Sequence, residues 1–199
     1  YAIGVRAGDV KWKDVDGNGI INDNDRVVTG SSNPDFFGGW NNSFRYKGFQ
    51  MDIFFTYMYG NDVYAEWMLN TTKLAHNAPP EAKDVLNRWT GPGSTNKYPR
   101  AILNGSGNNV KNSTRILTDG SFIRLRSLTF SYNFRKELIS RIGMKGLRVF
   151  FQGDNLFILT RYPGWDPEVS KNMDPRFFGV DRFNVPQPRT FTLGLNITF

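Results

Sequence analysis

The stretch RTFTLGLNITF, residues 189–199, alternates apolar and polar side chains without interruption. Successive side chains of a β-strand point to opposite faces, so this period of two places every apolar side chain on one face. The apolar members are Phe191, Leu193, Leu195, Ile197 and Phe199. A tilted strand needs roughly 9–11 residues to cross the hydrocarbon layer of a bilayer. The stretch therefore predicts a strand with one apolar face and enough length to span a membrane.

Other parts of the chain repeat this pattern. With the closing stretch, the predicted strands are residues 5–13, 37–46, 49–59, 121–134, 145–160 and 189–199. The alternation is only rough in 5–13. In 121–134, Arg124 and Arg126 fall in the same register as Phe122 and Leu128, so we expect the membrane-facing part to begin near Leu128. The pattern predicts an all-β fold with about six antiparallel strands.

The links between these strands alternate between long and short. The long links are residues 14–36, 60–120 and 161–188, and the short links are 47–48 and 135–144. Outer-membrane β-barrels have short periplasmic turns and long extracellular loops. If the last strand descends to a periplasmic end, every link falls on the expected side. The longest link contains two predicted short helices, 63–69 and 81–89, and its length indicates a functional or disordered loop.

Composition excludes several classes of protein. The chain has no cysteine and only one histidine, His76, so disulfides, thiolate metal sites and histidine-rich metal sites are excluded. The net charge is +7, but the basic residues are dispersed and match no nucleic-acid motif, so we expect no nucleic-acid partner. No apolar run reaches the roughly 18 residues of a transmembrane helix. Because the chain starts at Tyr1 without a signal peptide, we expect it to be a mature or proteolysed piece.

The segment DVDGNGIINDND, residues 14–25, fits the spacing of a calcium-binding loop. In such loops, carboxylate and amide oxygens at positions 1, 3 and 5 and a carbonyl at position 7 bind the ion, and a glycine at position 6 permits a sharp turn. Position 12 here is an aspartate, which reaches the ion less well than glutamate. The alternative is an Asp/Asn/Gly-rich turn without an ion. The predicted calcium ligands are Asp14, Asp16, Asn18, Ile20 through its carbonyl, and Asp25.

The chain resembles the C-terminal part of SusC/RagA-type TonB-dependent outer-membrane transporters of the Bacteroidetes. The resemblance rests on stretches that occur in the expected order along most of the chain. They are DVDGNGIINDNDR (14–26), NPDFFGGWNNSFRYKGFQMDIFFTYMYGNDVY (33–64), SFIRLRSLTFSYNF (121–134), LRVFFQGDNLFILTRYPGWDPEVS (147–170) and PQPRTFTLGLNITF (186–199).

This resemblance implies a function and a set of partners. The fold would be the C-terminal strands of a 22-stranded transmembrane β-barrel in the bacterial outer membrane, in contact with its lipid. The whole transporter would import oligosaccharides or peptides, with energy from TonB and a SusD-like surface lipoprotein as its lid. Its terminal aromatic residue, Phe199, would be a signal for the barrel assembly machinery. In the last long loop, Trp165, Asp166 and Glu168 are expected to contact the substrate or the lid.

Two other hypotheses remain from the sequence. The first is a soluble, calcium-stiffened β-sandwich that binds glycans, with Trp40, Trp67, Trp89 and Trp165 as stacking residues. The second is an enzyme, but the chain has no G-x-S-x-G motif and no catalytic residues can be assigned. We therefore expect no enzymatic activity.

Overall fold

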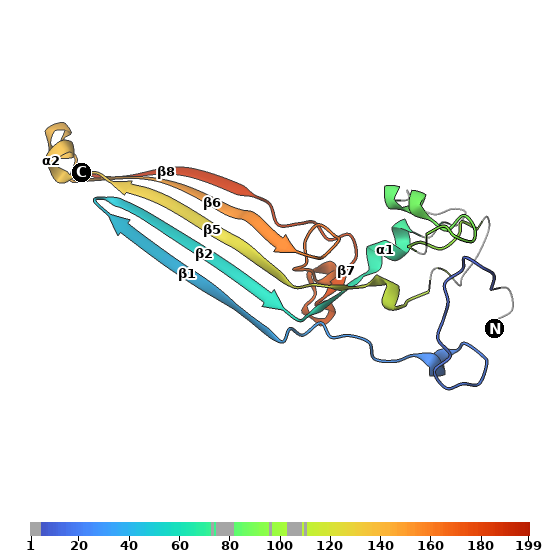
Figure 1. Cartoon of the computed structure of the whole chain (residues 1–199). Coiled ribbons are helices and arrows are strands. Elements are labelled where there is room, and N and C mark those ends of the chain that lie inside the picture. Colours follow the sequence, from blue (N-terminus) through green and yellow to red (C-terminus); the bar gives the residue numbers. More distant parts are fainter. Residues whose placement is uncertain (1–4, 73, 75–81, 96, 103–108, 110) are drawn as a thin grey trace. The chain divides into compact units, whose positions relative to one another are not determined.

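A computed structural model describes residues 5–72, 74, 82–95, 97–102, 109 and 111–199 (Figure 1). His76 lies outside the described residues. The chain divides into two compact units. We call them the sheet unit, which comprises Ser31–Val63, Asp119–Val169 and Asn184–Phe199, and the loop unit, which comprises Tyr1–Gly30, Tyr64–Thr118 and Ser170–Phe183.

The sheet unit is built on five long antiparallel strands in the order β1-β2-β5-β6-β8 (Figure 1). Five of the six strands predicted from the sequence are thereby confirmed, with small shifts at their ends. Their bounds are β1 Phe36–Tyr46, β2 Phe49–Tyr59, β5 Phe122–Asn133, β6 Gly146–Thr160 and β8 Thr190–Thr198. The hydrogen-bonded neighbours follow the chain order, as expected for a meander of antiparallel strands.

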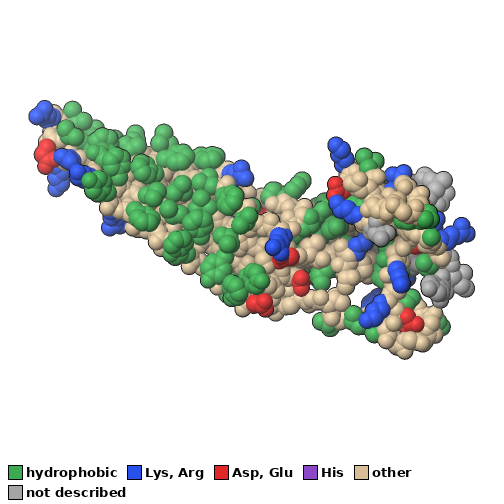
Figure 2. All heavy atoms as spheres, in the orientation of Figure 1, with side chains coloured by type: hydrophobic (Ala, Val, Ile, Leu, Met, Phe, Trp, Pro, Cys, Tyr) green, Lys and Arg blue, Asp and Glu red, His purple; other side chains and the backbone are tan. Residues whose placement is uncertain are grey.

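The two faces of this sheet differ in chemistry. Residues that pair directly across antiparallel strands share a face. One face, which we call the apolar face, joins Trp40 to Phe55, Ile53 to Leu128, and Phe130 to Phe151. Its side chains are largely exposed, with Leu193 at 76%, and Figure 2 shows apolar side chains gathered over the sheet. An exposed apolar surface of this extent requires an apolar environment or a partner.

The opposite face, which we call the polar face, carries hydrogen-bonding side chains. Ser43 donates to Asp52 at 2.5 Å, and Arg148 donates to Ser131 at 3.1 Å. Other members are Asn41, Arg45, Gln50, Thr129, Gln152, Asp154, Thr192 and Asn196. Strands that alternate apolar and polar in this way can separate a hydrocarbon layer from water.

A bulge in β5 changes the register that the sequence predicted. Leu125 pairs with Phe55 and Ser127 with Phe54, so Arg126 has no cross-strand partner. The extra residue reverses the alternation, and Phe122 and Arg124 therefore lie on the polar face, while Leu128 lies on the apolar face. The prediction that these residues share one register is wrong. A strict period of two cannot account for an inserted residue.

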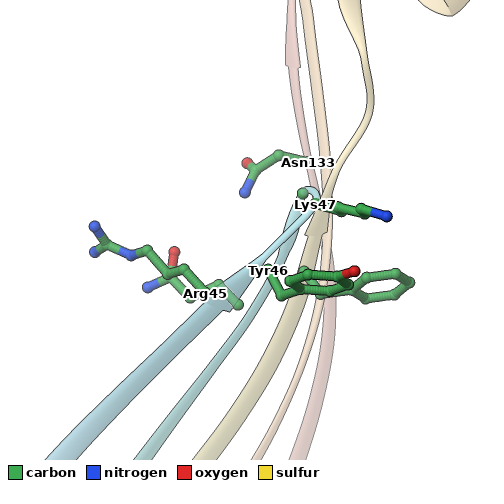
Figure 3. A pocket seen from close by; sticks show the side chains of 7 residues that line it. Arg45, Tyr46, Lys47 and Asn133 are labelled. Atoms are coloured by element: carbon green, nitrogen blue, oxygen red, sulfur yellow. The ribbon is translucent and has the colours of Figure 1, made fainter.

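The short links are compact. Lys47 and Gly48 form the β1–β2 turn with φ values of 46° and 91°, and the second conformation suits glycine. Figure 3 shows Arg45 and Lys47 at this turn pointing away from each other. The β5–β6 link contains α2 (Lys136–Ile139) and a 3₁₀ turn, η4 (Ser140–Ile142).

The loop unit contains short elements around a small core. Its apolar core residues include Leu69, Val85, Tyr98 and Ile116. The helical elements are η1 Asp23–Asp25, α1 Glu66–Thr71, η2 Lys83–Asn87, η3 Thr114–Ile116, η5 Lys171–Met173 and η6 Pro175–Phe177. Short strands β3 Asp62–Ala65, β4 Leu117–Asp119 and β7 Val180–Asp181 form a second sheet in the order β4-β3-β7. Among the described residues, no helix has the length and apolar character needed to cross a membrane.

The strand predicted at residues 5–13 is not present. The described part of this segment contains a turn, in which Asp9 accepts a hydrogen bond from the Arg6 amide at 2.9 Å. The Asp9 carboxylate also binds Arg100 at 2.8 Å, and Gly8 has a φ of 87°. Local side-chain bonds of this kind compete with the pairing of extended strands. The described residues on the N-terminal side of the 14–36 link therefore contain no strand, whereas β1 follows the link.

Candidate functional site

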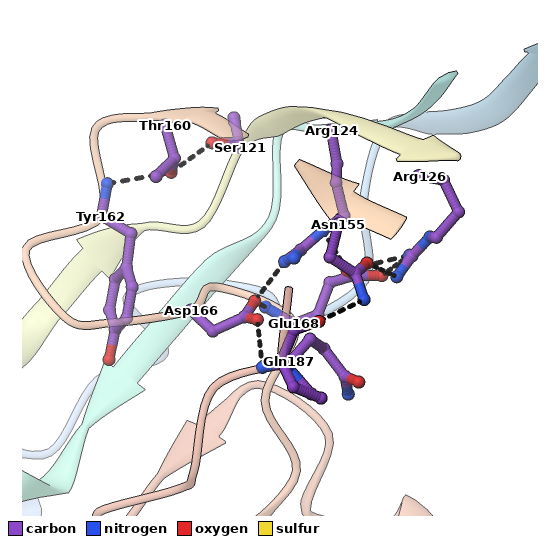
Figure 4. A network of polar contacts seen from close by, with 10 residues as sticks. Ser121, Arg124, Arg126, Asn155, Thr160, Tyr162, Asp166, Glu168 and Gln187 are labelled. Carbon is purple, nitrogen blue, oxygen red and sulfur yellow. Dashed lines mark hydrogen bonds and ion pairs between the residues drawn. The ribbon is translucent and has the colours of Figure 1, made fainter. Parts of the chain in front are cut away.

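A network of charged residues ties the last long loop to the end of β5 (Figure 4). The bulge directs Arg124 to the polar face, where its guanidinium lies 2.5 Å from Asp166 and 2.8 Å from Glu168. Arg126 donates to both oxygens of Glu168, at 2.6 and 2.9 Å. The Arg124 and Asp166 side chains are only 4% and 8% exposed. The loop is therefore fixed to the strand by a partly buried ion network.

Backbone groups complete this network. Asp166 also accepts hydrogen bonds from the amides of Glu168 at 2.9 Å and Gln187 at 3.2 Å. Asn155 donates to the Pro188 carbonyl at 3.1 Å. The two ends of the loop, near residues 166 and 187, are thus connected to each other. Both carboxylates predicted to contact substrate or lid are engaged in holding the loop, whereas Trp165 is 76% exposed.

Residues 14–25 of the loop unit, which we call the acidic loop, bring three predicted metal ligands together. One carboxylate oxygen from each of Asp14, Asp16 and Asp25 lies within 4.8 Å of the others. Donors bound to a single calcium ion at about 2.4 Å lie at most about 4.8 Å apart, so this spacing suits one ion. Asn18 is held in the same turn, because its side-chain oxygen accepts from the Ile20 amide at 2.7 Å.

Backbone amides organise these carboxylates. Asp14 accepts from the amides of Gly19 and Gly17, each at 2.7 Å, and Asp25 accepts from Val15 and Asn22, each at 2.7 Å. The Gly19 amide in particular lowers the pKa of the Asp14 carboxyl. Gly17 and Gly19 have φ values of 74° and 78°, which the turn requires. These amide bonds preorganise the loop, and the Ile20 carbonyl accepts only a long contact, 3.4 Å, from Asn22.

The sequence did not assign partners to Arg124 and Arg126. The signal was nevertheless present, because two arginines interrupt the apolar register of an otherwise alternating strand. Such residues in a membrane strand need carboxylate partners, and the loop supplies two. Phe199 follows the last residue of β8 and is 73% exposed. Its predicted function as an assembly signal stays a prediction.

Comparison with known proteins gives a consistent result. The chain is 34% identical over 193 residues to TonB-dependent receptor P3 of Formosa agariphila, which covers 94% of the chain. It is 30% identical over 198 residues to TonB-dependent receptor P39 of the same organism. It is 26% identical over 189 residues to TonB-dependent receptor SusC of Bacteroides thetaiotaomicron. No family model matches the chain.

Solved structures share the fold. The chain matches the RagAB peptide transporter with a TM-score of 0.71 at 24% identity, over 86% of the chain and 18% of that protein. It matches the "open-open" state of the RagAB peptide importer with a TM-score of 0.69. The chain spans between 17% and 20% of the length of its curated relatives.

These relatives explain the sheet. Its five strands are a segment of a transmembrane β-barrel, the apolar face is the lipid-facing one, and the relatives are receptors and transporters rather than enzymes. The soluble sandwich and the enzyme are both set aside by this result. Over nearly all of its length the chain is homologous to one segment of TonB-dependent receptors of the bacterial outer membrane, SusC among them.

Proposed function

We propose that this chain forms part of the wall and external loops of a transporter that imports nutrients across the outer membrane. The observation that carries the proposal is the two-faced sheet, which has lipid-compatible side chains on one face and hydrogen-bonding side chains on the other. A barrel with this distribution encloses a polar interior. The names of the relatives, which include a TonB-dependent receptor and a peptide importer, support the same function.

The proposal includes partners and a class of substrate. Energy would come from TonB, a SusD-like surface lipoprotein would cover the external mouth, and the cargo would be oligosaccharides or peptides. Support comes from the likeness to SusC and to the RagAB peptide importer. Trp165 is the best-exposed of the three residues expected to meet substrate or lid, because Asp166 and Glu168 are bound by arginines.

The test uses the full-length receptor in its native bacterium. Deletion of the receptor gene should abolish growth on one class of oligosaccharide or peptide, and the intact gene should restore it. A surface lipoprotein should co-purify with the tagged receptor in detergent. Unchanged uptake of every tested oligosaccharide and peptide after deletion would contradict the proposal.

We also propose that the acidic loop binds calcium and thereby stiffens an external loop. The spacing of the Asp14, Asp16 and Asp25 oxygens supports this, as does the lowered pKa of the Asp14 carboxyl. Asn18 and the Ile20 carbonyl would complete the ligand set. Bound calcium would supply charge neutralisation and no chemistry.

Calorimetric titration of the full-length receptor tests the calcium site. The wild type should bind one calcium ion at this loop, and Asp25→Ala should lose that binding. Asp23→Asn is the matched control, because Asp23 pairs with Arg26 on the surface at 3.0 Å and is not a predicted ligand. Asp25→Glu should tighten binding, since the longer side chain reaches the ion with both oxygens. Equal binding by wild type and Asp25→Ala would refute the site.

A further inference from the structure

The end of the sheet that carries the short links is strongly basic. The β1–β2 turn and the β5–β6 link together contain five cations and one carboxylate, Glu137. The cations, which we call the basic rim, are Lys47, Arg135, Lys136, Arg141 and Lys145. All five are exposed, and none forms an ion pair with a described carboxylate. Figure 2 shows Lys and Arg side chains gathered at the end where Figure 1 places α2.

Apolar side chains accompany these cations. Within the β5–β6 link, Ile139 is buried, but Leu138 and Ile142 are 61% and 64% exposed. These two lie four positions apart across the consecutive turns α2 and η4, so they project in similar directions. Nearby, Tyr46 and Ile197 of the apolar face are also exposed, at 68% and 44%. The link thus extends the lipid-facing surface and surrounds it with positive charge.

A segment that combines exposed apolar residues with cations that form no ion pair with a described carboxylate matches the boundary between acyl chains and anionic head groups. Short links of outer-membrane barrels face the periplasm. We propose that the basic rim binds anionic phospholipid head groups of the periplasmic leaflet, with Leu138 and Ile142 inserted among the acyl carbons next to those head groups. Charge complementarity and continuity with the lipid-facing sheet select this occupant over a soluble protein. The inference rests on membrane location and not on the imported substrate.

The experiment measures which lipids remain bound to the full-length receptor. The receptor is reconstituted in nanodiscs of equal parts phosphatidylglycerol and phosphatidylethanolamine and extracted into mild detergent. Mass spectrometry then gives the ratio of the two retained lipids. Wild type should retain an excess of phosphatidylglycerol. The rim variant, with Lys47, Lys136, Arg141 and Lys145 each changed to Gln, should reduce that excess by about fivefold or more, since each such charge contributes about fivefold to binding an anionic surface.

A matched variant controls for net charge. It changes four exposed, unpaired lysines of the loop unit to Gln: Lys11, Lys13, Lys83 and Lys111. It should retain the wild-type lipid ratio. The single variant Glu137→Lys adds a cation to the rim and should raise the phosphatidylglycerol excess, which keeps the test decisive if the fourfold rim variant fails to assemble.

Several results would overturn the proposal. One is an unchanged lipid ratio in the folded rim variant. Another is an equal loss in the matched control, which would assign the effect to net charge alone. A third is no increase with Glu137→Lys. Added salt should also reduce the excess, because the Debye length shortens to about 3 Å at 1 M.

Discussion

Replacement of Arg124 by Met tests whether the ion network holds the last long loop. The substitution removes the cation that lies 2.5 Å from Asp166 and 2.8 Å from Glu168. Methionine retains much of the apolar stem, so the main loss is electrostatic. We expect the loop to open far more often, while the transmembrane part of the sheet remains folded.

The magnitude follows from burial. Breaking a buried ion pair by removing one partner costs about 3–5 kcal/mol, because the other charge stays buried and uncompensated. Asp166 keeps two backbone donors and Glu168 keeps Arg126, so the lower end, about 3 kcal/mol, is expected. Since each 1.4 kcal/mol corresponds to about tenfold, loop opening should increase about a hundredfold.

Hydrogen–deuterium exchange on the full-length receptor measures this opening. Peptides covering residues 162–169 should exchange about a hundredfold faster in Arg124→Met. Adding Asp166→Leu should recover part of the protection, because the uncompensated carboxylate is removed. Lys97→Met is the control, since Lys97 and Asp84 form a pair at 3.0 Å with both side chains more than half exposed. Exchange within about threefold of wild type in Arg124→Met would refute a loop held by charge.

Three further predictions concern the faces of the sheet and the acidic loop. Leu193→Arg on the apolar face should destabilise the assembled barrel by about 2–4 kcal/mol, whereas Thr192→Arg on the polar face should cost little, and the unfolding temperature on a heat-modifiability gel distinguishes them. Gly194→Val should destabilise the same barrel by about 1–3 kcal/mol, because a Cβ there would lie 2.3 Å from the ring of the cross-strand phenylalanine. Asp14 has a lowered pKa, so its ordering of the acidic loop is complete above its ordinary value of 3.8 and is lost as the pH falls through the lower folded-state value. Exchange of peptides covering residues 14–25 should therefore rise only below that ordinary value.

Periodicity predicted the membrane strands because one face of each strand contacts lipid. The lipid requires an apolar residue at every second position, and β2 and β8 accordingly appear in the sequence with little ambiguity. The alternation of short and long links between the five strands of the sheet was also predicted from the sequence. The acidic loop could be predicted because calcium-type turns require particular residues at fixed spacing, and the structure brings three of the predicted ligands together.

The features that the sequence did not predict depend on contacts between residues that are distant in the chain. Asp9 forms an ion pair with Arg100, which lies 91 positions away in the sequence, and no local pattern in residues 5–13 predicts this contact. The sequence predicts that Asp166 and Glu168 contact the substrate or the lid. It does not predict their arginine partners, which lie 42 positions earlier in the chain. A single unpaired residue in β5 also moved two side chains to the other face. Alternation alone detects strands well but does not determine where their registers break.

The bulge at Arg126 gives β5 two independently adjustable halves. On the membrane side of the bulge, the apolar residues must stay at the alternate positions that face lipid, since a shift of one position would expose polar side chains to lipid. On the loop side of the bulge, the other set of alternate positions lies on that face, because the inserted residue shifts the register by one. A change in length confined to the loop-side half can therefore be accommodated without moving any side chain from lipid to lumen. The bulge therefore allows the external loops to change in length and sequence while the register of the barrel wall stays constant.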